Sequence, residues 1–378
     1  MAYWILLGAI IMLIHLKNYV PEQILSNENV VSVDNLLRSF QEKKHILLTK
    51  KSFFKHIIDE KNSLYSYNTK QVAFEAMKGQ AEYSSLINLV SFYIVVDFNI
   101  KDNTTKWTDN GNVVNFTVGP QYFKDSSRLQ ASNIIFENIT DNDFYKIIVN
   151  YFSRQHKTNL CNIICNPING GGGTTKEVFE RHIQNNDLVL CLLDNDKKHP
   201  KGPLGSTSKA FGKEKFNKSG MVKILDVHEI ESLIPIETLE KSVTTGTNKN
   251  KTIEFLRASL QHNESMKFYF DHKKGLELKA AFELDKLHGP FWIPLLKSSP
   301  DLKKSDCLDE ERCACKPPCI KIDGFGENIL SKSIEFIQKG NLQIYNPKLS
   351  PLLENHWLDI GKLLFSWCCG PSKKTRLT

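Results

Sequence analysis

The sequence lacks an apolar run long enough to cross a membrane as a helix, which needs about 20 apolar residues. The stretch that comes nearest is Tyr3–Leu16, and it is shorter than that. No basic residue precedes it and no small-residue cleavage site follows it, so it does not have the pattern of a secretory signal. We therefore expect a buried helix or strand here, with a membrane anchor as the alternative, and a cytoplasmic protein without a membrane partner.

Internal repeats, low-complexity tracts and a Walker-type nucleotide motif are also absent from the sequence. The segment Asn169–Lys176 (NGGGGTTK) is rich in glycine, but it does not follow the order G-x-x-x-x-G-K-[ST] of a phosphate loop. We interpret it as a turn whose backbone N–H groups can approach a nucleic-acid phosphate. Any dependence on ATP must then come from a partner protein.

A strong charge of one sign is missing as well. The 378 residues include 49 Lys and Arg against 42 Asp and Glu, for a formal net charge of +7, and the basic residues are spread along the chain. This excess suits a polyanionic partner such as nucleic acid but does not require one. Hydrophobic residues make up 41% of the chain, enough for two or three units with sizeable cores.

The pattern of apolar and polar residues divides the chain into three expected units. Residues 1–128 predict a mixed α+β domain with a hairpin whose turn contains Asn110 and Gly111. Residues 129–240 predict an α/β catalytic domain. Residues 241–378 predict a helical domain, interrupted by a cysteine-rich segment at 307–319.

In the middle unit, short apolar runs alternate with amphipathic segments of helix length. Asp141–Arg154 and Thr175–Gln184 have helical periodicity. The expected strands are Asn133–Phe136, Leu160–Cys165, Leu188–Leu193 and Val222–Leu225. Continuously apolar strands separated by helices indicate a parallel sheet covered on both faces, so the predicted fold class is a doubly wound α/β core.

Acidic residues follow two of these strands, at the sheet edge where α/β proteins bind ligands. Glu137 ends the first strand, with Asp141 four residues later, and Asp194 and Asp196 end the third. Hard divalent cations such as Mg²⁺ prefer such oxygen ligands. Because clustered carboxylates raise one another's pKa when no cation is present, we expect a metal site.

Residues 133–236 resemble the TOPRIM domain shared by topoisomerases, primases and OLD-type nucleases, and most closely its variants in bacterial anti-phage nucleases. The resemblance rests on strand-Glu-helix, a glycine-rich turn and strand-Asp-x-Asp, in that order. It implies that Glu137 is a general acid or base and that Asp194 and Asp196 hold Mg²⁺ or Mn²⁺. In the OLD-type version the acid equivalent to Asp141 also binds metal. The sequence departs from the family at Asn138, where glycine is usual.

Three further residues are candidates for this site. Glu229 and Glu231 follow the fourth strand and resemble an acidic segment of the anti-phage relatives, so each is a candidate metal ligand or base. They are also typical of a helix N-terminus enriched in acids. Lys223, within the fourth strand, is a candidate for stabilising charge on a phosphate during catalysis.

Four cysteines lie within one short polar segment, in the pattern C-x5-C-x-C-x3-C. Four thiolates complete a tetrahedral zinc site, and so polar a loop has few other means of holding one shape. The alternative is a set of free thiols. The candidate ligands of this structural zinc are Cys307, Cys313, Cys315 and Cys319.

These observations predict a metal-dependent endonuclease that hydrolyses phosphodiester bonds of DNA or RNA. The resemblance adds the expectation of an effector in antiviral defence, working with an ATPase or a sensor protein. Two alternatives stay open. One is another TOPRIM nucleotidyl-transfer chemistry. The other is a catalytically inactive TOPRIM module that regulates or assembles a complex, and Asn138 in place of the usual glycine is the residue that supports this alternative.

Overall fold

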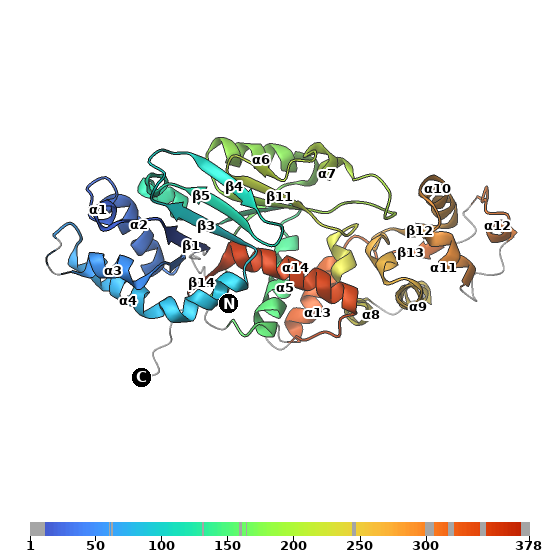
Figure 1. Cartoon of the computed structure of the whole chain (residues 1–378). Coiled ribbons are helices and arrows are strands. Elements are labelled where there is room, and N and C mark those ends of the chain that lie inside the picture. Colours follow the sequence, from blue (N-terminus) through green and yellow to red (C-terminus); the bar gives the residue numbers. More distant parts are fainter. Residues whose placement is uncertain are drawn as a thin grey trace.

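The structure is a computed structural model. It describes residues 12–59, 61, 63–130, 132–158, 161–163, 165–243, 247–298, 306–316, 321–340 and 345–371. Within these residues, two mostly parallel five-stranded sheets are surrounded by helices (Figure 1), so the chain is an α/β protein. No described helix is both long and apolar enough to span a bilayer.

The first sheet has the strand order β2-β1-β3-β5-β4. All neighbours pair in parallel except β4 and β5, which form an antiparallel hairpin. The elements of this part are β1 (Leu13–Lys17), α1 (Pro21–Ile24), α2 (Val30–Gln41), β2 (Ile46–Leu48), α3 (Lys51–Ile58), α4 (Tyr67–Ser84), η1 (Ser85–Asn88), β3 (Phe92–Asp97), β4 (Thr105–Asp109), β5 (Val114–Val118), η2 (Pro120–Lys124) and η3 (Ser126–Leu129).

The hairpin turn confirms one expectation and the sheet corrects another. Asn110 donates a backbone hydrogen bond to Val113 O at 3.1 Å, and Gly111 has the left-handed φ of 83° that such a turn needs. The α+β prediction for residues 1–128 is wrong, because helices alternate with parallel strands as in the middle of the chain. Of Tyr3–Leu16, the described part begins at Met12 and enters β1, an internal strand of the sheet, whose Leu13 and Ile14 are fully buried.

The second sheet has the order β10-β11-β9-β6-β8, with only β10 antiparallel to its neighbour. The elements of this part of the chain are β6 (Asn133–Phe136), α5 (Asp141–Gln155), β7 (Cys161–Ile163), β8 (Asn166–Asn169), η4 (Gly172–Thr174), α6 (Thr175–Gln184), β9 (Val189–Leu193), α7 (Ser206–Ala210), β10 (Phe216–Asn217), β11 (Gly220–Ile224) and η5 (Ile230–Leu233). The predicted helices and three of the four predicted strands are confirmed.

Helices cover both faces of this sheet. Because alternate residues of a strand point to opposite sides, each inner strand contributes side chains to two separate clusters. In β9, Leu190 and Leu192 join the large core, whereas Cys191 and Leu193 pack in a separate cluster with Phe179 of α6. A strand buried on both faces reads as a continuous apolar run. The doubly wound prediction is therefore confirmed for this sheet.

The second predicted strand, Leu160–Cys165, is not part of this sheet. Its described residues form β7, which pairs antiparallel with β14 (Cys369–Pro371). The sheet instead takes Asn166–Asn169, the polar segment NPIN, as edge strand β8 beside β6. Proline is tolerated on an edge strand because it lacks only the N–H that would face outward. The sequence does not predict this strand, because it is polar and the predicted strands are apolar runs.

The last part of the chain is mainly helical, as predicted, with one two-stranded sheet formed by β12 and β13. Its elements are α8 (Ile236–Ser242), α9 (Thr247–His262), η6 (Glu264–Phe268), β12 (Gly275–Glu277), α10 (Leu278–His288), α11 (Trp292–Ser298), α12 (Asp306–Asp309), β13 (Lys321–Asp323), α13 (Ile329–Lys339), α14 (Pro351–Cys368) and β14.

Helix α14 returns to the centre of the molecule and packs against α5 and β3 (Figure 1). Trp367 stacks on Phe92 of β3 with ring centroids 4.3 Å apart, and Trp357 meets Phe144 of α5 edge to face. A Cβ added to Gly361 would lie 2.6 Å from the Cβ of Phe152, so glycine permits the close approach of α14 to α5. The final helix thus joins the two sheets in one core.

Candidate active site

The site lies where the parallel strands of the second sheet end at their carboxyl termini. Backbone pairing between β9 and β11 continues into the loops, where Asn195 N donates to Val227 O at 3.1 Å and Asp196 N donates to His228 O at 2.9 Å. This continued pairing places the residues after β9 beside those after β11. It explains why acids that are more than thirty positions apart in the sequence meet at one edge.

Glu137 connects the ends of β6 and β9. Its side-chain Oε1 accepts a hydrogen bond of 3.0 Å from the backbone N–H of Asp194. The carboxyl group of Asp194 in turn accepts from Ile230 N at 3.2 Å, at the start of η5. Ser208 of α7 donates to the backbone carbonyl of Asp194. The two predicted carboxylates are thus fixed by backbone groups rather than extended into solvent.

Asp141 occupies the first turn of α5 and is buried. Its Oδ2 accepts from Asn138 N at 3.0 Å, while Asn138 Oδ1 accepts from Thr140 N at 3.2 Å. Asn138 has no left-handed φ, so the turn does not require glycine at this position. The asparagine side chain stabilises the turn by a local hydrogen bond to the backbone.

Glu229 and Glu231 are both buried and share one cation, Lys273. Lys273 Nζ lies 3.2 Å from Glu229 Oε2 and 3.0 Å from Glu231 Oε1. Glu229 Oε1 also accepts from His272 N at 2.7 Å. Lys273 follows η6 in a loop with no recognisable motif, and the sequence analysis missed it for that reason.

Asp196 is the most exposed member of the group. Its backbone has a φ of 55°, a left-handed conformation that Asp tolerates better than most residues. Its side chain lies directly against Gly205, where an added Cβ would be 2.0 Å from Asp196 Oδ2. Gly205 N donates to Asn195 O at 3.0 Å, which holds this glycine in place. Any larger residue at position 205 would displace the Asp196 carboxylate.

The acids of this edge raise one another's pKa. Burial, followed by the charges of Asp196 and Asp141, raises the pKa of Glu137 to about 7, against the opposing hydrogen bond from Asp194 N. Burial raises the pKa of Asp141 to about 7, and Glu231 adds to this. Burial and the charge of Glu137 raise the pKa of Asp194 well above its ordinary value.

The same reasoning applies to the second acidic pair. Burial and the neighbouring Glu229 raise the pKa of Glu231 to about 7, and burial also raises the pKa of Glu229. Burial alone would lower the pKa of Lys273, but the charges of the two glutamates raise it above the ordinary value. Lys273 is therefore protonated at neutral pH, and one cation compensates two buried carboxylates.

A second polar group adjoins the acids. The ligand atoms of His228, Glu229 and Asp271 all lie within 4.8 Å of one another, and all three residues are buried. Burial would raise the pKa of Asp271, but hydrogen bonds from His228, Lys274 N and Lys198 lower it below the ordinary value. Asp271 has no motif around it, so the sequence does not predict its place in this group.

Lys223 is placed elsewhere. It lies within β11, in register with Leu192 of β9, and its charge acts on His356 of α14, whose pKa is lowered mainly by burial. The cation in contact with the acids is Lys273 instead. The expected catalytic role of Lys223 is therefore not supported by its position, because it precedes the carboxyl end of its strand rather than following it.

The glycine-rich turn after β8 supports the backbone of Glu137. Gly171 N and Gly172 N lie 3.1 and 3.3 Å from the carbonyl oxygen of Glu137, and both glycines have left-handed φ values of 74° and 60°. Two N–H groups that we expected to approach a phosphate are thus directed at the chain itself. The turn positions Glu137, which is a supporting role rather than a phosphate-binding one.

The residues of this edge fit a divalent cation. Glu231 is only 2% exposed, yet its Oε2 has no hydrogen-bond partner among the described residues, and the same holds for His228 Nδ1. A buried carboxylate oxygen without a partner is costly, so such an atom indicates a missing ligand. Carboxylate oxygens are the ligands that Mg²⁺ and Mn²⁺ prefer.

Of the predicted zinc ligands, three come together. The sulfur atoms of Cys307, Cys313 and Cys315 lie within 4.8 Å of one another, and Cys319 lies outside the described residues.

The fold and this edge define an α/β protein with a buried acidic cluster at the carboxyl ends of parallel strands. No family model matches the chain, and no curated protein matches it either.

Proposed function

We propose that this chain is a TOPRIM-type, metal-dependent nuclease that hydrolyses phosphodiester bonds of DNA or RNA at the Glu137–Asp194 edge. The observation that carries this proposal is a set of interacting acids at this edge, where burial and neighbouring acids raise the pKa of Asp194 and where Glu231 Oε2 is buried with no hydrogen-bond partner among the described residues. A fold gains nothing from such a cluster by itself, because burial and mutual repulsion both destabilise the ionised carboxylates.

Different residues of the chain would bind the metal and exchange the proton. Asp194, Asp196 and Asp141 would hold Mg²⁺ or Mn²⁺, with Glu229 and Glu231 as further ligands. When bound, such an ion polarises the phosphate and lowers the pKa of a water molecule. Glu137 has a pKa of about 7, which is suited to exchanging a proton near neutral pH. The hydrogen bond from Asp194 N fixes the carboxyl group for that exchange.

Cleavage of plasmid DNA and of total cellular RNA, with Mg²⁺ or Mn²⁺, tests the proposal directly. The variants are Glu137→Ala and Asp194→Ala, and the matched control is Asp143→Ala, a half-exposed acid that pairs with Lys146 on α5. We expect cleavage by the wild type and the control only. Loss on removing a general acid or base is typically 10²–10⁴-fold, that is, roughly two to four decades in rate.

One observation favours a second function, an inactive module that regulates or assembles a complex. Lys273 already compensates Glu229 and Glu231, so a cation of the chain itself stands where a metal would otherwise be needed. Electron paramagnetic resonance of added Mn²⁺ separates the two functions. Mn²⁺ bound by the wild type but not by Asp194→Ala supports the nuclease, whereas free Mn²⁺ with both proteins, together with uncut DNA and RNA, would overturn it.

The role in antiviral defence, and an ATPase or sensor as partner, follow from the resemblance alone. They belong to this proposal and depend on its outcome.

A further inference from the structure

The cysteine segment has the geometry of a metal-thiolate centre rather than of a disulfide. Cys307 lies in α12, and Cys313 and Cys315 lie in the loop after it. Cys307 Sγ and Cys315 Sγ are 3.6 Å apart. Zinc–sulfur bonds of about 2.3 Å in a tetrahedron place two sulfur atoms roughly 3.8 Å apart. A disulfide would require about 2.0 Å.

The backbone is shaped to bring these sulfurs together. Glu311 has a φ of 52°, a left-handed conformation that disfavours a residue with a long side chain. Arg312 N donates to Cys307 O at 3.2 Å, which closes the turn. This reversal directs Cys313 and Cys315 back toward the helix that carries Cys307. A strained backbone of this kind persists only where its surroundings determine it.

Among the described residues of the segment, Cys307 and Cys313 pack against the core. Leu308 is buried, but the ion pairs Lys297–Glu311 and Glu310–Arg312 join side chains that are mostly exposed. Exposed pairs of this kind contribute about 0–1 kcal/mol each. A bound metal would restrict the segment further, because it joins three side chains that otherwise move independently.

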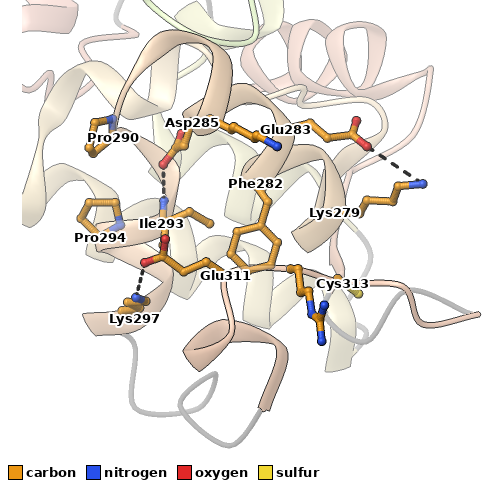
Figure 2. A pocket seen from close by; sticks show the side chains of 12 residues that line it. Lys279, Phe282, Glu283, Asp285, Pro290, Ile293, Pro294, Lys297, Glu311 and Cys313 are labelled. Atoms are coloured by element: carbon orange, nitrogen blue, oxygen red, sulfur yellow. Dashed lines mark hydrogen bonds and ion pairs between the residues drawn. The ribbon is translucent and has the colours of Figure 1, made fainter.

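The segment forms one wall of a cavity of about 750 Å³ between α10 and α11. Figure 2 shows Phe282 and Ile293 within this cavity, with Cys313 at one side and the Lys297–Glu311 ion pair at another. Asp285 accepts from Ile293 N at 2.8 Å and fixes the start of α11. Two walls of the cavity are thus parts of helices, whereas the third depends on the cysteine loop.

We infer that Cys307, Cys313 and Cys315 bind a zinc ion that fixes the loop 306–316 as a wall of this cavity. Thiolates are soft ligands and select Zn²⁺ over Mg²⁺ and Mn²⁺. The chain would therefore hold two chemically distinct metals, a hard cation at the acids and a soft one here. This inference does not depend on the nuclease proposal, since zinc binding is measured without any substrate.

Metal analysis of the full-length protein, purified without chelator, tests the inference. We expect about one zinc per chain, and we expect cobalt to replace it with a thiolate-to-metal charge-transfer band. Cys307→Ser and Cys315→Ser should each lose the zinc and the band. Cys165→Ser, a partly buried thiol outside the cluster, and Asp194→Asn should retain both. Zinc retained by both cluster variants, or absent from a wild type that shows no cobalt band, would overturn the inference.

Limited trypsin digestion tests the claim about the wall. Arg312 is 82% exposed at its side chain, and a loop held by zinc should resist cleavage there. Removing zinc with a chelator should speed cleavage after Arg312 by about tenfold, as expected for the loss of a local constraint. Cleavage after Arg257 of α9 serves as the internal reference. Equal rates at Arg312 with and without zinc would show that the metal does not hold the loop.

Discussion

Glu137 Oε1 accepts a hydrogen bond from Asp194 N at 3.0 Å, so the ends of β6 and β9 are joined through a side chain that also carries a raised pKa. Two effects act in opposite directions on the pKa of this carboxyl group. Its hydrogen bond favours the ionised form, whereas burial and the nearby acids favour the neutral form. Because the pKa rises to about 7, burial and repulsion have the larger effect, and a bound cation would lower this pKa again.

The first prediction concerns pH. Glu137, Asp141 and Glu231 have pKa values near 7 when folded, above their ordinary values. The folded state therefore binds more protons than the unfolded state between about pH 4.5 and 7, and stability without metal should fall as pH rises through this window. Thermal unfolding in a chelator, measured from pH 5 to 8, should show a falling melting temperature.

Metal binding should have the opposite dependence on pH. The carboxylates must lose their protons to bind a cation, so affinity should rise by up to about tenfold per pH unit for each proton released below pH 7. Mn²⁺ titrations at pH 6 and pH 8 measure this directly. An affinity that does not change between these two values would contradict the assignment of these acids as ligands.

The second prediction is that Asp194→Asn stabilises the metal-free protein while it abolishes metal binding. The substitution removes one charge from a group of mutually repelling acids and keeps the shape of the side chain. We expect a gain of about 1–3 kcal/mol in the free energy of unfolding, the scale on which unpaired buried charges act. Urea unfolding with and without Mn²⁺ provides the measurement, and Asp143→Asn, at a half-exposed acid of α5, provides the control. A less stable Asp194→Asn protein would show that the charge is needed for folding.

The third prediction separates the two proposed functions at Lys273. Lys273→Met leaves Glu229 and Glu231 buried without their cation, which should cost about 3–5 kcal/mol in the absence of metal. Mn²⁺ should restore much of this stability if the edge binds metal. Lys274→Met, the exposed neighbouring residue, should change little. Destabilisation that Mn²⁺ does not relieve would favour the inactive module, in which the lysine replaces the metal.

The fourth prediction concerns Gly205, which contacts Asp196. Gly205→Ala adds a Cβ that would lie 2.0 Å from Asp196 Oδ2 and 2.4 Å from its Cβ, so the carboxylate must move. Displacing one ligand should weaken Mn²⁺ binding by about 10-fold or more, as the loss of supporting contacts around a metal does. Gly173→Ala is the control, because its added Cβ meets nothing within 4 Å. Unchanged Mn²⁺ affinity in Gly205→Ala would place Asp196 outside the metal site.

Much of the site was accessible from the sequence because parallel strands present their carboxyl ends at one edge. Glu137, Asp141, Asp194 and Asp196 follow apolar runs, and the periodic helices between those runs fixed which edge they share. Lys273 and Asp271 could not be found in this way. They come from an irregular loop after η6, and only the packing of that loop against η5 brings them to the acids.

The pattern of apolar residues in the sequence by itself determined the strands β6, β9 and β11, the helices α5 and α6, and the hairpin at Gly111. The tertiary structure alone decided the rest. It selected the polar NPIN segment as the edge strand, because an edge needs pairing on one side only, and it packed α14 against α5 and β3. It also paired Lys273 with Glu229 and Glu231, because the free energy of a buried charge depends on neighbours that are distant in the sequence.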